Sequence, residues 1–515
     1  MRLQAPSFVG RTVARVVTTA LAVVVALAFA RPAPAQDAPA PAPIVSADPA
    51  LEAALAPIVQ DRSLRGTDVG VHLVRVSDGA TVFAQAADTL MLPASTMKVV
   101  TAAAALDALG PSYRFTTELL HEEDIDAAGV LHGNLYVKGG GDPTLVLQDL
   151  WKIVYDLKTH GVTRIEGDVV FDESLFGTDH RLVGWDKASD IENGPSYFTP
   201  LSALSLNYNT IALVTGPGVE AGKPVRAELE TPVGDLYEID NQAVTGAAGT
   251  RRNVQVEREI DGQKMKFVLT GSIPIDGEVD LDYRAVPDPT AYFIAAFRQL
   301  ARERGVTVAG RWRLGNAPRD AELLLRHRSA PLAVVLMDMN KYSNNHYAEQ
   351  VLRVLGAEVH GVPGTTESGI QVVDAYLSGL GLDASTRVLV NGSGLSRGLM
   401  LTPATLTRVL VDMAGDWSVG HEFAASLAIA GRDGTLWRRV REDPGRLRGK
   451  TGTLDGVHGL CGYVTGTHGD LYAFAFLVND VSGTSSPIKR VHDRFVREVM
   501  GSGVEEAAVA SGDDE

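Results

Sequence analysis

Apolar and polar positions alternate between residues 70 and 85, in the string GVHLVRVSDGATVFAQ. Asp78-Gly79 interrupts the alternation, and this dipeptide favours the tight turns that join paired strands. The pattern therefore predicts a β-hairpin. The following string, STMKVVTAAAALDALG (95–110), is rich in alanine and predicts a helix that ends at Gly110.

The pattern changes between about residues 115 and 319. Short apolar runs such as NLYVKG, GDVVFDESLFG and NTIALVTGPG are separated by Gly, Asp and Pro, which predicts an inserted, strand-rich region. Helical periodicity returns in 331–356 and 367–381, and residues 459–480 predict a terminal hairpin. A pair of strands thus leads into a helix, and further helices and a second hairpin follow the insertion.

The first residues have the features of an export signal. Arg2 and Arg11 precede an apolar run at 16–30, and Ala33-Pro34-Ala35 supplies the small residues of a cleavage site. We predict a signal peptide at 1–35, because the run is shorter than the roughly 20 residues of a spanning helix. The expected protein is exported, to the periplasm or the exterior of the cell envelope, with no stable membrane span after processing.

Composition limits the remaining possibilities. A chain of 515 residues exceeds what one core usually serves, so we expect two or three domains between an Ala/Pro-rich tether at 36–49 and an acidic tail at 501–515. Cys461 is the only cysteine, which excludes an internal disulfide. The formal charge of −16 and the lack of a basic run argue against nucleic acid as a partner.

Ser95-Thr96-Met97-Lys98 places a hydroxyl and an amine one helical turn apart, within reach for activating a weak nucleophile. Ser343-Asn344-Asn345 begins a second predicted helix. Its residues could relay a proton and bind a substrate amide, or could serve only as a helix cap. Neither motif is specific by itself.

Lys450-Thr451-Gly452-Thr453 precedes an apolar alternating run, so it is expected along a strand that lines a cleft. The lysine and the two hydroxyls could hold a carboxylate, and Gly452 would let a substrate backbone approach closely. A turn at a sheet edge is the plainer interpretation. The order Ser-x-x-Lys, Ser-x-Asn, Lys-Thr-Gly, however, is that of penicillin-binding proteins and serine β-lactamases.

Longer strings make the resemblance specific. The sequence resembles the D-alanyl-D-alanine carboxypeptidase/endopeptidase family, the low-molecular-mass class C penicillin-binding proteins, over roughly residues 51–500. The strings that carry the resemblance are GGGDPTL (139–145), GDVVFDESLFG (167–177), LSALSLNYN (201–209), NKYSNNHYAE (340–349), GSGLSR (392–397), GRDGTL (431–436) and KTGTLDGV (450–457). Two positions depart from the family pattern: Asn391 replaces its usual Asp, and Leu399 replaces its usual Asn.

This resemblance implies an α+β fold. A transpeptidase/β-lactamase-like catalytic domain, an antiparallel sheet flanked by helices, would comprise 50–114 and 320–500, with one or two strand-rich inserted domains at 115–319. It also implies a serine-type D-Ala-D-Ala carboxypeptidase that acts on peptidoglycan stem peptides through an acyl-enzyme and is inhibited by β-lactams.

Roles for the motif residues follow from the same resemblance. Ser95 is the expected nucleophile and Lys98 its base. Ser343, Asn345 and Lys450 complete the catalytic set, and Thr451, Gly452 and Thr453 bind substrate. Asp142 and Arg397 are expected beside the amino and carboxyl groups that end a meso-diaminopimelate side chain.

Three alternatives remain open: a DD-endopeptidase that cleaves cross-links with the same residues, a β-lactamase or esterase, and a non-catalytic wall-binding protein. The long insertion argues against the second and the intact motifs against the third. The histidines show no zinc-peptidase spacing, and Gly139-Gly140-Gly141 lacks the rest of a phosphate-binding loop. The sequence therefore implies no metal and no cofactor.

Overall fold

The computed structural model describes residues 46–184 and 194–501. The predicted signal peptide, most of the tether and nearly all of the acidic tail lie outside these ranges. Within them, no helix is both long and apolar enough to cross a membrane.

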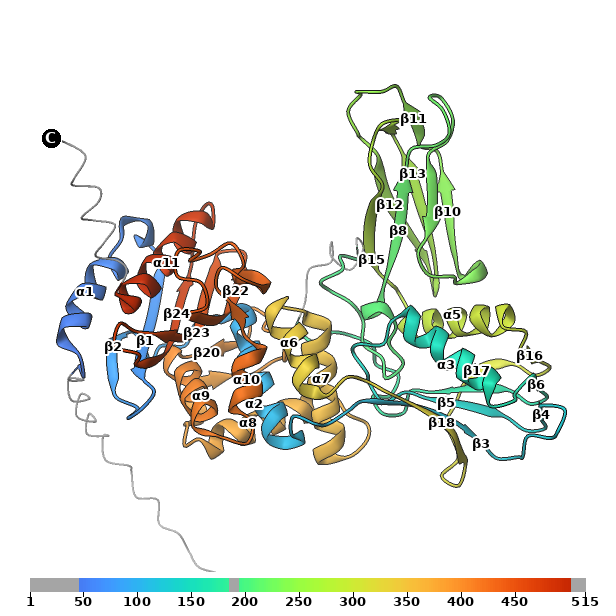
Figure 1. The fold of residues 1–515 in the computed structure, drawn as a ribbon, viewed down its shortest axis with the longest axis horizontal. Helices are drawn as coiled ribbons and strands as arrows, with labels where there is room; N and C mark the ends of the chain where they lie inside the picture. The colour runs from blue at the N-terminus through green and yellow to red at the C-terminus, as the bar shows by residue number, and fades with distance from the viewer. Residues whose placement is uncertain (1–45, 185–193, 502–515) are drawn as a thin grey trace, which may run out of the picture. The chain divides into compact units, whose positions relative to one another are not determined.

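The largest sheet of the described residues has six strands in the order β2-β1-β24-β23-β22-β21, and every neighbouring pair is antiparallel. Its strands are β1 Asp68–Arg75, β2 Thr81–Gln85, β21 Ala428–Ile429, β22 Leu447–Leu454, β23 Val457–Thr465 and β24 Leu471–Asn479. Both predicted hairpins are present, as β1–β2 and β23–β24. Strands from the two ends of the sequence thus form one sheet (Figure 1).

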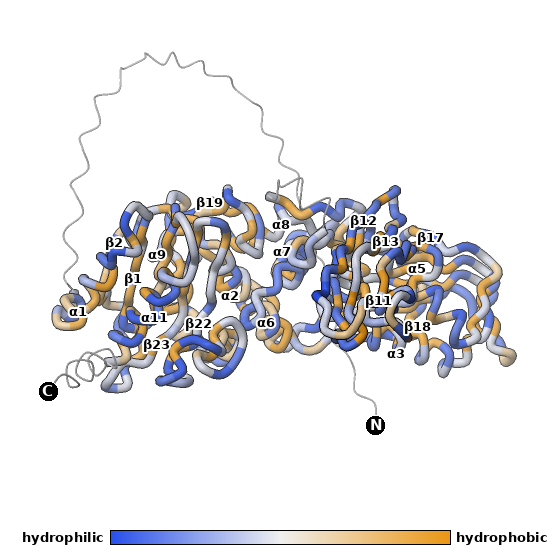
Figure 2. The backbone as a smooth tube through the Cα atoms, turned by 90° about the horizontal axis from the view of Figure 1, so that it is seen from above, coloured by the Kyte–Doolittle hydropathy of each residue, from blue (hydrophilic) through white to orange (hydrophobic). Residues whose placement is uncertain are grey.

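Two groups of helices cover this sheet (Figure 1). One face packs on α1 (Pro49–Val59) and α11 (Ser486–Met500), which share a core with Val71, Phe474 and Phe476. The helices of the other face are α2 Met97–Leu109, α6 Leu332–Lys341, α7 Asn345–His360, α8 Thr366–Gly379, α9 Pro403–Gly415 and α10 Gly420–Ser426. Hydrophobic positions recur along β1 and α9, whereas connecting loops are more hydrophilic (Figure 2).

The insertion is built around a five-stranded sheet in the order β17-β7-β5-β3-β18. Its strands are β3 Thr116–His121, β5 Leu135–Lys138, β7 Val169–Asp172, β17 Trp312–Leu314 and β18 Glu322–Arg328. Helices α3 (Leu147–Thr159) and α5 (Pro289–Glu303) contribute Leu150, Ile153 and Phe293 to its core. The described part of the insertion is therefore rich in strands, as expected, but it also contains the amphipathic helices α3 and α5 and several parallel strand pairs.

The described residues also form several smaller sheets. Those of the insertion are formed by β4 Val130–Leu131, β6 Arg164–Ile165 and β16 Thr307–Val308; by β8 Thr210–Gly216, β9 Arg226–Leu229 and β15 Asp280–Ala285; by β10 Tyr237–Asn241, β12 Gln255–Asp261 and β13 Lys264–Thr270; and by β11 Val244–Gly246 and β14 Ser272–Pro274. A two-stranded sheet, β19 (Arg387–Val388) and β20 (Met400–Leu401), lies among the helices.

The chain enters and leaves the insertion through paired strands. β3 follows α2, β18 precedes α6, and the two are antiparallel, with Thr116 opposite Arg328. β18 falls within the range that the sequence assigns to the catalytic domain, yet it belongs to the five-stranded sheet of the insertion. Helix α7 contacts the segment ahead of β8, since Gln350 Nε2 donates to the Ser202 carbonyl at 2.9 Å.

Candidate active site

The Ser95 side chain projects from a short 3₁₀ turn, Ala94–Thr96, that leads directly into α2. Ala94 has a φ of +47°, a left-handed conformation that is uncommon for a residue with a side chain and is often associated with function. The helix then runs to a cap at Gly110, whose φ is +74°. The turn thus holds the serine hydroxyl at the N-terminal end of a buried helix.

Two glycines allow other segments to pack against this turn. A Cβ added to Gly394 would lie 1.9 Å from the Ala94 carbonyl oxygen, and one added to Gly452 would lie 2.7 Å from the Pro93 carbonyl oxygen. The sequence predicted that Gly452 lets a substrate approach. In the structure, the segment that approaches Gly452 closely is the nucleophile turn itself.

Lys98 lies at the centre of the site and is fully buried. Its Nζ donates to Ser95 Oγ at 2.9 Å, to Asn345 Oδ1 at 2.7 Å and to the Ser393 carbonyl at 2.8 Å. Burial, together with the positive charge of Lys450, holds the pKa of Lys98 well below its ordinary value. A neutral amine could accept the Ser95 proton and still donate to the other two oxygens.

Ser343 and Asn345 flank the residue that caps helix α7. Asn344 Oδ1 accepts from the Tyr347 N–H at 3.2 Å, so the capping role belongs to the middle residue of the motif. Ser343 has a φ of +59°, and its Oγ accepts from Lys450 Nζ at 2.8 Å. Lys450 is fully buried, and this burial lowers its pKa to about 7.

Strand β22 presents an open edge beyond Gly449. β21 pairs only with Arg448 and Gly449, so among the described residues no strand adjoins this edge from Lys450 to Leu454. An extended peptide could add to such an edge through its backbone groups. Thr451 Oγ1 donates to Thr435 Oγ1 at 2.9 Å, and Thr453 is exposed.

A cavity of about 650 Å³ joins these parts. Its lining includes Ser95, Ser343, Asn345, Thr453 and Arg397. The structure thus brings the three motifs and Arg397 together at one cleft, with Lys98 and Lys450 buried beneath it. The Arg397 side chain is exposed, and its Nη2 donates to the Asp455 carbonyl.

Asp142 is not among the residues that line this cleft. Only 2% of it is exposed, and its Oδ1 accepts from the N–H and the hydroxyl of Thr144, at 2.8 and 2.6 Å. Its Oδ2 lies 3.9 Å from His327 Nε2. In this structure the Asp142 carboxylate caps a buried turn, and its place beside the amino group of a diaminopimelate side chain stays a prediction.

The two departures from the family pattern have structural explanations. Asn391 Nδ2 donates to the Val183 carbonyl at 3.1 Å, a hydrogen bond that an ionised aspartate could not make. Leu399 is fully buried in the core between the helices, where an asparagine would need new polar partners.

Sequence reasoning missed several residues of the site. The Ser393 carbonyl accepts from Lys98 Nζ, and the Tyr197 carbonyl accepts from Asn345 Nδ2. Tyr197 and Leu395 also line the cleft. Two of these contacts use backbone atoms, which leave no signal in residue type. Glu349 had a signal, since it follows Asn345 by one helical turn in the string NKYSNNHYAE.

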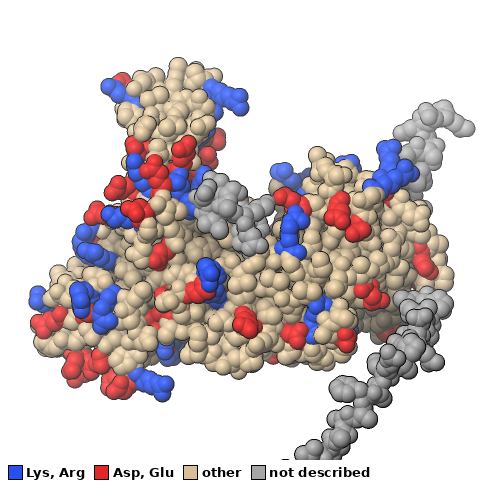
Figure 3. Space-filling model, turned by 180° about the vertical axis from the view of Figure 1, so that it is seen from behind, with Lys and Arg blue, Asp and Glu red and all other residues tan. Residues whose placement is uncertain are grey.

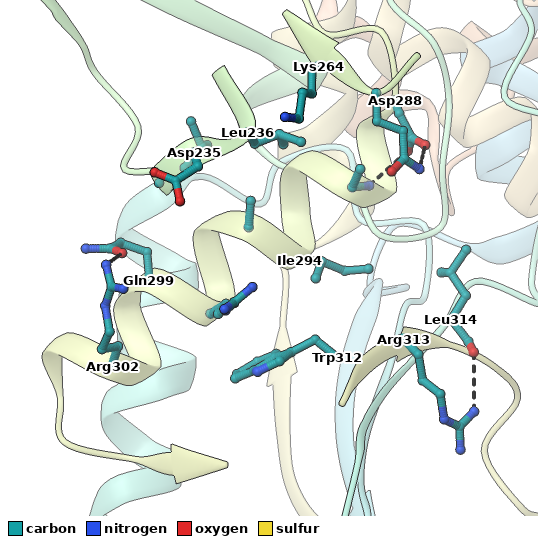
Figure 4. A pocket seen from close by; sticks show the side chains of 16 residues that line it. Asp235, Leu236, Lys264, Asp288, Ile294, Gln299, Arg302, Trp312, Arg313 and Leu314 are labelled. Atoms are coloured by element: carbon teal, nitrogen blue, oxygen red, sulfur yellow. Dashed lines mark hydrogen bonds between the residues drawn. The ribbon is translucent and has the colours of Figure 1, made fainter. Parts of the chain in front are cut away.

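A second, separate cavity of about 490 Å³ lies in the insertion beside α5 (Figure 4). Lys264, Asp288, Arg302 and Trp312 are among its lining residues, and none of the predicted site residues is. Charge is also dispersed: Figure 3 shows basic side chains scattered among acidic ones on one face of the molecule. The described residues contain no cluster of side chains that could hold a metal ion.

Comparison with known families decides the identity of this site. A family model of the D-Ala-D-Ala carboxypeptidase 3 (S13) family matches residues 51–498. The chain belongs to this family. It is accordingly a serine-type D-Ala-D-Ala carboxypeptidase of the penicillin-binding kind, and the predicted family and enzyme class are confirmed.

Individual S13 relatives agree along most of the chain. A D-alanyl-D-alanine carboxypeptidase from Actinomadura sp. (strain R39) is 35% identical over 442 residues, which cover 83% of this chain and 80% of the relative. The D-alanyl-D-alanine carboxypeptidase DacB of Haemophilus influenzae is 29% identical over 433 residues, covering 81% and 86%.

Solved structures match as well. The crystal structure of penicillin binding protein 4 (dacB) from Haemophilus influenzae has a TM-score of 0.74 at 26% identity and covers 87% of this chain and 99% of that one. The same protein complexed with a β-lactam has a TM-score of 0.69. The predicted α+β fold with additional strand-rich sheets is thereby confirmed.

Proposed function

We propose that this carboxypeptidase removes the terminal D-Ala of peptidoglycan stem peptides through an acyl-enzyme on Ser95. The observation that carries the proposal is the position of Lys98 Nζ, 2.9 Å from Ser95 Oγ and 2.7 Å from Asn345 Oδ1. A buried amine with a lowered pKa at hydrogen-bond distance from a hydroxyl is the arrangement that activates a serine.

The reaction then proceeds in two steps. Ser95 Oγ attacks the carbonyl carbon of the penultimate D-Ala while Lys98 Nζ takes its proton, and the N–H groups of Ser95 and Thr453 hold the oxyanion. Ser343, bonded to Lys450, passes a proton to the nitrogen of the leaving D-Ala as the C–N bond breaks, and the Lys450 ammonium re-protonates Ser343. Water then attacks the ester carbonyl and gives a proton back to Lys450 through Ser343, while Lys98 returns its proton to Ser95 Oγ as the ester bond breaks.

The location and inhibition of the enzyme are part of the same proposal. The export signal predicted at 1–35 would bring the enzyme to its peptidoglycan substrate outside the cytoplasm. Its similarity to a protein solved with a bound β-lactam supports β-lactams as inhibitors that acylate Ser95.

Mass spectrometry of the penicillin-treated protein tests this assignment. One penicillin should add to each chain, and peptide mapping should place it on Ser95. The same protein should release D-Ala from a pentapeptide ending in D-Ala-D-Ala. An adduct that persists in Ser95→Ala would show that another residue is the nucleophile.

A second function, DD-endopeptidase action on cross-links, is favoured by a further cavity of about 580 Å³ along β22. Its lining includes Tyr342, Thr451, Trp437, Arg438 and Lys489. Tyr342 and Thr451 are the chain neighbours of Ser343 and Lys450, the pair proposed to protonate the leaving nitrogen, and we infer that a bulky leaving group would reach this cavity. The Arg438 guanidinium lies 4.1 Å from the centre of the Trp437 ring, and such a lining suits a large leaving group with carboxylates.

Cleavage of a dimeric, cross-linked muropeptide can be compared with release of D-Ala from a monomer. The Arg438→Ala variant should lose about tenfold in kcat/KM on the dimer and little on the monomer, because only the dimer has a second stem to occupy this cavity. Equal losses on both substrates, or none on either, would exclude this function for the cavity.

A further inference from the structure

Glu349 is a buried carboxylate beside the active site that the mechanism above does not use. It lies on α7 one turn beyond Asn345 and is 1% exposed. Its Oε1 accepts from the Ser393 N–H at 2.8 Å, and its Oε2 accepts from the Gly392 N–H at 3.2 Å. Both oxygens therefore bind backbone donors of a single short loop.

That loop, residues 391–395, supplies one of the three acceptors of Lys98. The Ser393 carbonyl accepts from Lys98 Nζ at 2.8 Å, and the Gly392 carbonyl accepts from Thr101 Oγ1 at 2.7 Å. Gly394 packs against Ala94, next to the nucleophile. The Ser393 N–H shares its peptide unit with the Gly392 carbonyl, so Glu349 and Thr101 hold the two sides of one unit. The Ser393 carbonyl belongs to the next unit, whose Gly394 N–H donates to Asn391 Oδ1 at 3.1 Å. Glu349 therefore restrains the direction of the Ser393 carbonyl through the unit that precedes it.

The ionised carboxylate suits this arrangement, because it accepts with both oxygens and has no donor of its own. A glutamine would turn an NH₂ group toward one of the two backbone donors. Burial raises the pKa of Glu349 above its ordinary value, although hydrogen bonds from the Ser393 side chain and from the two backbone N–H groups, and the charge of Lys98, act in the opposite direction.

Charged groups from two elements act on Lys98. Lys450 on β22 disfavours the ammonium form of Lys98, and Glu349 on α7 favours it. Arg353 lies one further turn along α7. Burial lowers its pKa, although the charges of Asp179 and Glu349 act in the opposite direction. In a buried site such opposite and like charges are screened weakly. Glu349 is thus the anion that opposes Lys450.

We propose that Glu349 is a positioning residue for acylation: it fixes the 391–395 loop, presents the Ser393 carbonyl to Lys98 and supplies the buried negative charge that counters Lys450. This inference rests on the proposed role of Lys98 as the base. It adds a residue that acts through Lys98 and does not touch the substrate.

The pH dependence of acylation tests it. The rate of reaction with a chromogenic β-lactam should rise with pH as Lys98 loses its proton. In Glu349→Gln the ammonium form loses its counter-charge, so the pKa of Lys98 falls. The acid limb of the profile should move to lower pH by about one to three units, the range that a neighbouring opposite charge produces. The maximal rate should also fall, because the loop is held by fewer bonds.

Glu358→Gln is the matched control, since Glu358 is exposed on the same helix and bonds Tyr113 Oη at 2.8 Å. It should leave both limb and maximal rate unchanged. A folded Glu349→Gln enzyme whose limb stays in place, or moves to higher pH, would overturn the inference. A loss of rate without a shift would show that Glu349 is merely structural.

If Glu349→Gln does not fold, the Glu349→Asp variant tests the proposed role of Glu349. It keeps the charge but is one methylene shorter, so the limb should stay within about half a pH unit while the maximal rate falls. A wild-type rate, or a limb displaced by more than about one unit, would contradict the inference. If the limb of the wild type were insensitive to Lys98→Arg, the proposed function itself would fail, whatever Glu349 does.

Discussion

The buried charges of the active-site cleft and the exposed ion pairs of the insertion have different consequences. In the cleft, Lys98, Lys450 and Glu349 are almost completely buried. In the insertion, ion pairs such as Arg313–Asp168 remain in contact with water, with side chains 41% and 19% exposed. Removing a charge that water surrounds alters the free energy of unfolding very little. A buried charge, in contrast, lowers stability and shifts the pKa of neighbouring groups. The charges buried in the cleft can therefore tune its chemistry, whereas an exposed pair such as Arg313–Asp168 has little such effect.

The largest expected effect comes from the base. Lys98→Arg keeps a positive charge that cannot be removed near neutral pH, so it cannot accept the Ser95 proton. The acylation rate should fall by about 10²–10⁴-fold, the usual contribution of a general base, and its rise with pH should disappear. Stopped-flow measurement of β-lactam acylation between pH 5 and 10, with wild type alongside, would show it. A variant that retained the pH dependence would locate the base elsewhere.

Lys450→Met should lose activity and gain stability. Burial lowers the pKa of Lys450 to about 7 from 10.5, so the unfolded chain binds more protons between these values and wild-type stability should rise with pH across that window. Methionine removes the free-energy cost of burying an ammonium group. Below about pH 7 the free energy of unfolding of Lys450→Met should therefore exceed that of wild type by about 1–4 kcal/mol, after the lost hydrogen bonds are counted.

Denaturant unfolding at several pH values is the measurement for Lys450→Met. The stability difference from wild type should shrink as the pH approaches 10.5. A variant less stable than wild type at pH 6 would mean that the bonds of Lys450 to Ser343 and the Thr451 carbonyl outweigh its burial.

A smaller effect is expected at the exposed rim. Arg397 should bind the terminal carboxylate of a diaminopimelate side chain, which a lysine side chain lacks. Matched D-Ala-D-Ala peptides should therefore differ by about ten- to a hundredfold in kcat/KM, and Arg397→Ala should abolish most of that difference. Equal values for both peptides in wild type would refute this role. Asp142→Asn, which alters a buried turn outside the cleft, is the comparison variant.

The smallest effect should come from the insertion. Arg313→Ala removes an exposed ion pair with Asp168, which water screens in any case. We expect kcat/KM on a pentapeptide to change by less than about twofold. A large loss would mean that the insertion takes part in substrate binding and would weaken the contrast between the two regions.

Local patterns predicted much of the fold and of the site. The turn at Asp78-Gly79, the end of a helix at Gly110 and the spacing of Ser95 and Lys98 depend on neighbouring residues, which a sequence displays directly. Helix α3 also had a signal, since Leu150, Ile153, Val154 and Leu157 recur at helical spacing, but its Gly-rich and Asp-rich surroundings favoured strands.

What the sequence could not reveal depends on contacts between distant segments. The Ser393 carbonyl reaches Lys98 across 295 positions of the sequence, and it does so with a backbone atom that every residue possesses. Asp142 stands in a string typical of the family, yet its burial beside Thr144 follows from packing in the insertion. Gly452 was predicted to let a substrate approach, and its lack of a side chain also lets the turn before Ser95 pack closely, a contact between distant segments that the sequence did not reveal.

The pairing of β1 with β24 bears on when the enzyme can form at all. Asp68 lies opposite Asn479, so β1, near the beginning of the described residues, can pair only after β24, near their end, is available. Strands that are so far apart in the sequence pair slowly during folding, because the entropy of closing a large loop is lost before stabilising contacts form. The turn that carries Ser95 also packs against Gly452. A chain that contains Ser95 and Ser343 but lacks β22 and β24 therefore has no finished catalytic centre.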